Sequence, residues 1–171
     1  MTQSAFVACD EKVVGTNRPR VLLGDDHVPF NDKLRSLLTP HFDVVGAAHD
    51  GEEVIAAAQR LRPDVIVLDI SMPVLNGLKA ARKLKETGML TKIVFCTMHA
   101  DATFVREAFD AGATGYVVKT AAATEMISAI REALRDHPYV SPSILPCPGA
   151  SRLQSKRFLA GFQTASVVDD L

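Results

Sequence analysis

Short runs of apolar residues alternate along the chain with longer segments whose apolar residues recur at helical spacing. The runs are rich in valine, isoleucine and leucine, which is typical of strands buried on both faces of a sheet. In the longer segments apolar residues lie three and four positions apart, as in Phe30, Leu34 and Leu38. The apolar runs are Val21 to Leu23, Val44 to Ala48, Val65 to Leu68, Ile93 to Cys96 and Tyr116 to Val118.

This alternation of five strands with five helices predicts an α/β fold built on a parallel sheet. We expect a flavodoxin-like, doubly wound five-stranded sheet with strand order 2-1-3-4-5 and helices on both faces. Pro40 and Pro63 are expected to end helices, and Gly88 and Gly112 can adopt the left-handed conformation that ends others. The five helical segments are those that contain Phe30, Val54, Leu78, Val105 and Met126.

The pattern divides the chain into three parts. Residues 19–140 are expected to form the folded unit, which is close to the commonest domain size. Residues 1–18 lack any pattern and are expected to be a flexible N-terminal extension. Residues 141–171 begin with SPSILPCPG, which is too rich in proline for a helix or a central strand, and continue as a short tail.

Composition limits the binding partners and the cellular location that the sequence predicts. Hydrophobic residues make up 47% of the 171 positions, and the net charge is −1, so no basic surface for nucleic acid or anionic membrane is expected. No apolar run approaches the roughly 20 residues of a membrane span, and the N-terminus does not resemble a secretion signal. Three widely spaced cysteines argue against disulfides and zinc. We expect a cytoplasmic protein.

Polar residues gather at the ends of the predicted strands. Asp25 and Asp26 follow the first strand, Asp69 the third, Thr97 the fourth and Lys119 the fifth. These strands are contiguous in the expected order, and α/β sheets bind ligands at this edge. Three neighbouring carboxylates repel one another unless a cation is present, and hard oxygen ligands suit Mg²⁺. The pattern therefore predicts a magnesium site.

A metal at this edge would leave Asp69 able to act as a nucleophile towards phosphorus. Lys119 would then pair with the phosphoryl group, and Thr97 would donate its hydroxyl to it. Each residue alone has an ordinary alternative: Asp25 and Asp26 as turn residues, Thr97 as a cap. Their joint occurrence favours a site.

The motifs LDISMPVLNG, CTMH and GATGYVVK, together with the acidic pair, resemble the receiver domain of two-component response regulators. The subgroup is the NarL/FixJ type, which usually carries a LuxR-type helix-turn-helix. The likeness runs from Arg20 to about Val140. It implies phosphorylation of Asp69 and Mg²⁺ coordination by Asp26 and Asp69.

The resemblance also assigns roles to residues around this centre. It implies that Asp25 acts on the metal through water, and that the backbone carbonyl of Ser71 is a further ligand. Thr97 and Lys119 would contact the phosphoryl group. Tyr116 matches the aromatic residue that turns inward when the threonine hydroxyl is drawn to that group; plain core packing is the alternative for Tyr116.

Two features depart from the family pattern. Thr120 stands where the family often has proline after the lysine, at a position where this subgroup is variable. The tail after Ser141 has neither the length nor the two successive amphipathic helices of a DNA-binding module. We therefore expect the helix-turn-helix domain to be missing, and direct DNA binding by this chain is unlikely.

The resulting hypothesis is a signalling switch and not an enzyme, apart from its own phosphorylation and dephosphorylation. A sensor histidine kinase or phosphotransfer protein would phosphorylate Asp69. The fourth helix, fifth strand and fifth helix would then bind a partner protein or a second copy. One alternative is a Mg²⁺-dependent phosphatase of the haloacid dehalogenase kind, although Ser71 replaces that family's second aspartate. Another is a receiver within a DNA-binding regulator of transcription.

Overall fold

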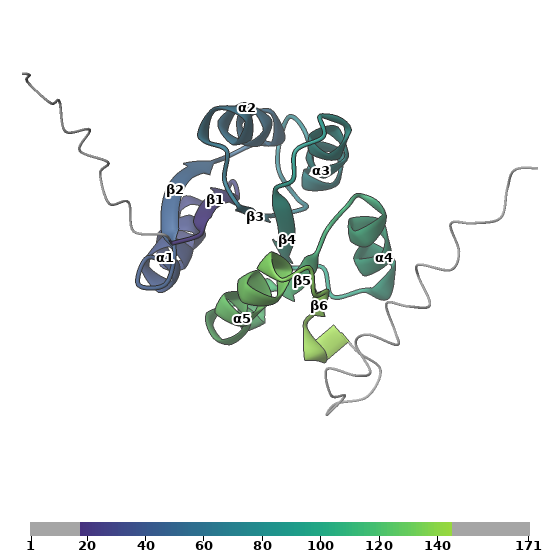
Figure 1. The fold of residues 1–171 in the computed structure, drawn as a ribbon. Coiled ribbons are helices and arrows are strands. Elements are labelled where there is room, and N and C mark those ends of the chain that lie inside the picture. Colours follow the sequence, from purple (N-terminus) through teal and green to yellow (C-terminus); the bar gives the residue numbers. More distant parts are fainter. Residues whose placement is uncertain (1–17, 145–171) are drawn as a thin grey trace, which may run out of the picture.

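A six-stranded parallel sheet forms the centre of the molecule (Figure 1). The computed structural model describes residues 18–144, so the expectations for residues 1–17 and 145–171 lie outside it. The strand order is β2-β1-β3-β4-β5-β6, which confirms the predicted order 2-1-3-4-5 and adds a short strand beside β5. The strands are β1 (Arg20–Gly24), β2 (Asp43–Ala48), β3 (Val65–Leu68), β4 (Lys92–Thr97), β5 (Gly115–Val118) and β6 (Tyr139–Val140).

Helices cover both faces of the sheet, as the continuous apolar strands predict (Figure 1). One buried cluster joins the sheet to α1 and α5, and the other joins it to α2, α3 and α4. Alternate residues of a strand enter different clusters: Val65 and Val67 face α1 and α5, whereas Ile66 and Leu68 face the other layer. The helices are α1 (Val28–Leu38), α2 (Gly51–Leu61), α3 (Gly77–Glu86), α4 (Ala102–Asp110) and α5 (Ala122–Leu134).

The helix ends follow local chemistry. Asp50 accepts hydrogen bonds from the backbone N–H groups of Glu52 and Glu53 and so caps α2. Asn76 and Asp101 cap α3 and α4 in the same way. Gly88 and Gly112 have φ values of 72° and 98°, which confirms the left-handed positions expected of them. Within residues 18–144 no helix is long and apolar enough to cross a membrane.

The described part of the chain forms regular structure up to and beyond Val140. β6 pairs in parallel with β5, and a 3-10 turn, η2 (Pro142–Ile144), follows it. Ser141, which the sequence places in the linker, is fully buried. The pattern did not reveal this strand because two residues are too few to show an alternation.

The loop between β3 and α3 is packed against the end of β3. The backbone N–H of Gly77 donates to the carbonyl of Ile70 at 2.9 Å. A Cβ atom on Gly77 would lie only 1.9 Å from the backbone oxygen of Asp69, so no other residue fits here without a backbone shift. This close approach fixes where the chain leaves β3.

We expect the substitution Gly77→Ala to lower the free energy of unfolding by at least about 1–3 kcal/mol, because the new methyl group meets backbone rather than a movable side chain. Gly46→Ala is the matched control. A Cβ at Gly46 would meet only the side-chain ends of Leu61 and Leu22, at 3.1 and 3.3 Å. We expect its effect to stay within about 1 kcal/mol. Urea denaturation measures the free energy of unfolding of both variants. Equal losses would contradict the close approach of Gly77 to the backbone of Asp69.

Candidate functional site

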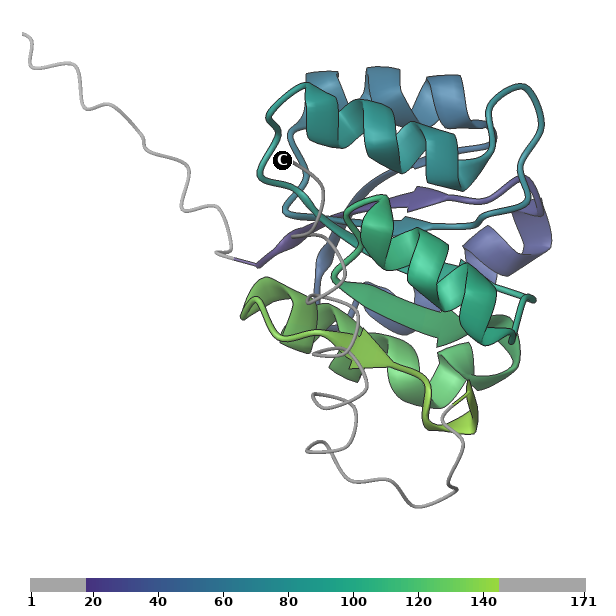
Figure 2. The same cartoon turned by 90° about the vertical axis from the view of Figure 1, so that its right-hand side faces the viewer.

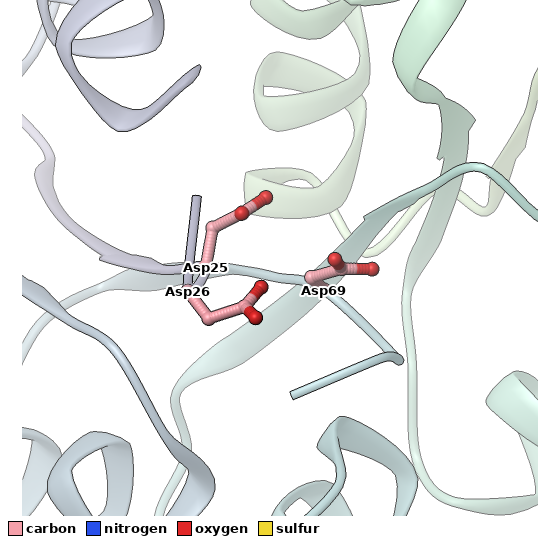
Figure 3. Close-up of side chains that lie close together, drawn as sticks. All are labelled: Asp25, Asp26 and Asp69. Carbon is pink, nitrogen blue, oxygen red and sulfur yellow. The ribbon is translucent and has the colours of Figure 1, made fainter. Parts of the chain in front are cut away.

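Three aspartates meet where β1 and β3 end. Asp25 and Asp26 directly follow β1, and Asp69 directly follows β3. The two strands are paired, with Gly24 opposite Leu68, so the residues after them lie side by side. One carboxylate oxygen of each aspartate lies within 4.8 Å of the others (Figure 3). Asp25 and Asp69 are buried, whereas Asp26 is exposed.

Lys119 brings a positive charge to two of these carboxylates. It directly follows β5, and its Nζ atom lies 2.6 Å from Oδ2 of Asp25 and 2.8 Å from Oδ2 of Asp69. The same ammonium group lies over the ring of Phe30, 4.8 Å from its centroid. The Lys119 side chain is only 13% exposed. A buried cation that bridges two buried carboxylates is strongly favoured over an unpaired one.

Burial and charge act on this cluster in opposite directions. Burial alone would lower the pKa of Lys119, but its hydrogen bonds to Asp25 and Asp69 outweigh that effect and raise the pKa. Burial raises the pKa of Asp25, and the hydrogen bond from Lys119 offsets this only in part. Lys119 therefore remains an ammonium group at neutral pH, and Asp25 takes up a proton more readily than an exposed aspartate does.

Backbone and side-chain hydrogen bonds hold the aspartates in place. Asn31 Nδ2 donates to the backbone carbonyl of Asp25 at 2.7 Å, and the N–H of His27 donates to Oδ1 of Asp25 at 2.9 Å. The N–H of Ser71 donates to Oδ1 of Asp69 at 3.3 Å. The cluster is thus preorganised by its own loops.

Thr97 and Tyr116 are both fully buried and are joined through the backbone of His99. The N–H of His99 donates to the Thr97 hydroxyl at 3.4 Å, and the Tyr116 hydroxyl donates to the carbonyl of His99 at 2.8 Å. Burial, followed by the negative charge of Asp69, raises the pKa of Tyr116, so its hydroxyl remains a donor. Tyr116 therefore points inward in this structure.

The His99 side chain reaches two further elements. Its Nε2 atom lies 2.9 Å from the hydroxyl oxygen of Ser71, in the loop after β3. Its ring stacks on Phe104 of α4 with centroids 4.1 Å apart and an interplanar angle of 22°. His99 therefore links the loop beside Asp69 to α4.

The structure brings Asp25, Asp26, Asp69 and Lys119 together. Thr97 lies at the end of the adjacent strand, where its hydroxyl accepts from His99. The metal-ligand role of the Ser71 carbonyl stays a prediction.

Sequence reasoning missed two supporting residues, Asn31 and His99. A signal for Asn31 was present, since it falls in helical phase with Leu34 and Leu38 and is a polar residue on the buried side of α1. His99 lies two residues after Thr97 in the sequence. Nothing in the sequence pairs it with Ser71, which is distant along the chain.

The donor chemistry of the cluster fits Mg²⁺. The three carboxylates offer hard oxygen ligands within reach of one ion, and the exposed side of Asp26 leaves room for the waters that Mg²⁺ retains. Lys119 neutralises only part of the negative charge of three carboxylates. A divalent cation would offset the remainder.

Comparison with known proteins identifies the class that this fold and site define. Residues 21–131 match the model of the response regulator receiver domain. The chain is 38% identical to the response regulator GacA of Pseudomonas viridiflava over 127 residues, which are 73% of this chain and 59% of GacA. It is 31% identical to the transcriptional regulatory protein DegU of Brevibacillus brevis over 133 residues, 77% of this chain and 56% of DegU.

A solved structure agrees with these relatives. The LuxR-family two-component response regulator from Aurantimonas sp. SI85-9A1 superimposes with a TM-score of 0.72 at 31% identity, covering 82% of this chain and 99% of that one. The chain belongs to the response regulator receiver domain family, and its relatives are of the NarL/LuxR type. It spans a little over half the length of the curated relatives DegU and GacA.

Membership settles the general class of function. Receiver domains of two-component systems generally act in signalling rather than catalysis, which disfavours the phosphatase alternative. They interact with histidine kinases or phosphotransfer proteins, and they bind Mg²⁺ at an acidic cluster. In this chain Asp25, Asp26 and Asp69 form such a cluster.

We expect Mg²⁺ to raise the free energy of unfolding, by about 2.7 kcal/mol at a concentration one hundred times its Kd. Asp26→Asn should weaken Mg²⁺ binding at least about tenfold, which is about 1.4 kcal/mol, without lowering metal-free stability, because Asp26 is exposed and adds repulsion to the cluster. Asp32→Asn, at an exposed position of α1, is the control. Urea denaturation with and without Mg²⁺ measures the effect, and equal responses of the two variants would contradict it.

The raised pKa of Asp25 also predicts a pH dependence. Because this pKa is higher in the folded protein than in the unfolded chain, Asp25 makes metal-free stability rise as pH falls through the window between the raised pKa and 3.8. A protonated Asp25 cannot serve the metal, so the Mg²⁺-dependent gain in stability should shrink over the same window. Denaturation curves at several pH values would test this, and a constant gain would count against it.

Proposed function

We propose that this chain is a phosphorylation-dependent switch of a two-component system that accepts a phosphoryl group on Asp69. The observation that carries the proposal is the Lys119 ammonium group, which binds Asp25 and Asp69 from a third strand. Asp69 thus has a fixed position beside a positive charge. A carboxylate nucleophile beside an acidic metal cluster and a lysine suits phosphoryl transfer.

The proposed donor is a phosphohistidine of a sensor kinase or phosphotransfer protein. A carboxylate oxygen of Asp69 forms a bond to phosphorus while the bond between phosphorus and the histidine nitrogen breaks, and the donor histidine keeps that electron pair. Lys119 then pairs with the phosphoryl oxygens instead of the free carboxylate. Asp26, Asp69 and the Ser71 carbonyl would hold Mg²⁺, with Asp25 acting through water. The bound ion would neutralise charge on the transferring group.

Exposed apolar side chains around the acidic centre support docking of such a donor protein. Val28, Val74 and Met98 are 51%, 77% and 67% exposed. They follow β1, β3 and β4 respectively, so all three belong to the edge of the sheet that carries Asp69. Val74 also has a φ of 63°, which is strained for a β-branched residue and often marks a functional loop.

His99 supports a switching role for Thr97 and Tyr116. If the Thr97 hydroxyl turns towards a phosphoryl group on Asp69, the N–H of His99 loses its acceptor. The carbonyl of the same residue holds the Tyr116 hydroxyl, and its ring holds Phe104 of α4. A change at Thr97 would thus reach α4 through one residue.

The output partner is proposed to bind the face formed by α4, β5 and α5, either as another protein or as a second copy of the chain. DegU is named as a transcriptional regulatory protein, and the Aurantimonas relative belongs to the LuxR family. These names favour control of transcription as the purpose of the switch. The cytoplasm, where such regulators meet their kinases, is the proposed location.

Acetyl phosphate with Mg²⁺ should add one phosphoryl group to the protein, and Asp69→Asn should abolish the adduct while the fold is retained. Asp110→Asn, at an exposed aspartate at the end of α4, should be labelled like the wild type. Intact-mass measurement detects the adduct, and circular dichroism checks the fold. A wild-type protein that stays unlabelled with donor and metal in excess would refute phosphorylation of this domain.

A further inference from the structure

Residues 139–144, here called the strap, lie along the outer edge of β5. Figure 2 shows β6 following the edge of the sheet beside α5. The N–H of Tyr139 donates to the carbonyl of Thr114 at 3.1 Å, and the N–H of Ser141 donates to the carbonyl of Tyr116 at 2.9 Å. Val140 is 2% exposed and enters the same buried cluster as Tyr116 and the buried residues of α4. The strap therefore occupies part of the α4–β5–α5 face.

Ser141 fastens the strap to two different elements. Its side-chain oxygen accepts the N–H of Val118 at 3.1 Å, and its hydroxyl donates to Oε2 of Glu125 in α5 at 2.5 Å. β6 has ended at this point, so the serine hydroxyl replaces the backbone acceptor that a longer strand would supply. Without it, the buried N–H of Val118 would lose this partner.

Val118, whose N–H group donates to Ser141, directly precedes Lys119 in the chain. Val118 is the residue before the 3-10 turn η1 (Lys119–Ala121), so the placement of its N–H group affects the direction in which the Lys119 side chain leaves β5. Lys119 in turn contacts Asp25 and Asp69. A continuous set of contacts thus runs from Asp69 through Lys119 and Val118 to Ser141.

We propose that the strap transmits the state of the Asp69 site to the C-terminal side of the receiver unit, with Ser141 as the positioning residue that couples the two. This inference rests on the proposed function, because a phosphoryl group on Asp69 is what changes the position of Lys119. Movement at Lys119 alters the contact between Val118 and Ser141. Since β6 contains only two residues, loss of that contact leaves little to hold the strap on β5.

The coupling between the strap and the Asp69 site also affects how a partner binds. A protein or second copy that binds the α4–β5–α5 face meets the strap as well as the helices. Because coupling free energies are reciprocal, a partner that displaces the strap also alters phosphorylation at Asp69. The strap is in this way part of the output surface.

Hydrogen exchange on the full chain tests the proposal, with intact mass measured on the same samples. Labelling by acetyl phosphate and Mg²⁺ should change amide exchange of Val118 and of the strap residues that carry an N–H group, which are all except Pro142, at least about fivefold in the wild type. Ser141→Ala should make exchange fast in both states and remove this dependence. It should also shift the labelling rate at least about threefold, which loss of strap packing alone would not do. Ser143→Ala, at an exposed strap position, should behave as the wild type.

The outcomes separate the two proposals. An unlabelled wild type overturns phosphorylation of Asp69, whereas a labelled protein with unchanged exchange in the strap overturns the coupling. Lys119→Met gives a second test that needs no phosphoryl group and applies even if Ser141→Ala fails to fold. It should change exchange of Val118 and Ser141, while the control Lys33→Met, on the exposed side of α1, should not. Unchanged exchange in Lys119→Met would also refute the coupling.

Discussion

The contact of Lys119 with Asp25 and Asp69 is the interaction on which the site depends. It joins the ends of three strands, β1, β3 and β5, through one ammonium group. Two buried carboxylates at this distance would repel each other strongly, and burial would favour their neutral forms. The Lys119 ammonium group lies within 3 Å of both carboxylates and offsets part of this repulsion. In the proposed switch, the oxygens of a phosphoryl group on Asp69 would compete for that ammonium group.

The continuous apolar strands explain how such a charged cluster is tolerated. β3 is buried along its whole length, with residues entering both hydrophobic clusters. The position of β3 is thus fixed by packing on two sides. Asp69 directly follows β3, so its position is fixed as well. Gly77 completes the arrangement, because its backbone lies against the carbonyl of Asp69 where any side chain would clash. Apolar packing sets the geometry, and the polar groups are confined to the strand ends.

Periodicity and strand-end chemistry predicted the five long strands, their order and the four charged residues that meet. These features are local or follow from parallel topology, so they are readable from one chain. Asn31 was partly readable, as a polar residue in the buried phase of α1. The strap was not, because β6 has two residues and Ser141 begins a proline-rich stretch of turn character. Contacts of His99 and Ser141 join residues far apart in sequence, and single-chain patterns carry no information about such pairs.

Two proposed routes start beside the acidic centre, and they differ in kind. The route through Thr97 and His99 depends on hydroxyl groups and on an aromatic stack with Phe104, so it requires side chains to reorient. The route through Val118 and Ser141 depends on a backbone N–H group at the end of β5, so it responds to small displacements of the strand itself. Both involve β5, since Tyr116 belongs to the first route and its backbone carbonyl also holds Ser141. A shift of β5 would therefore move α4 and the strap together. In the proposed switch, the α4–β5–α5 face would then respond in a concerted way instead of through two independent changes.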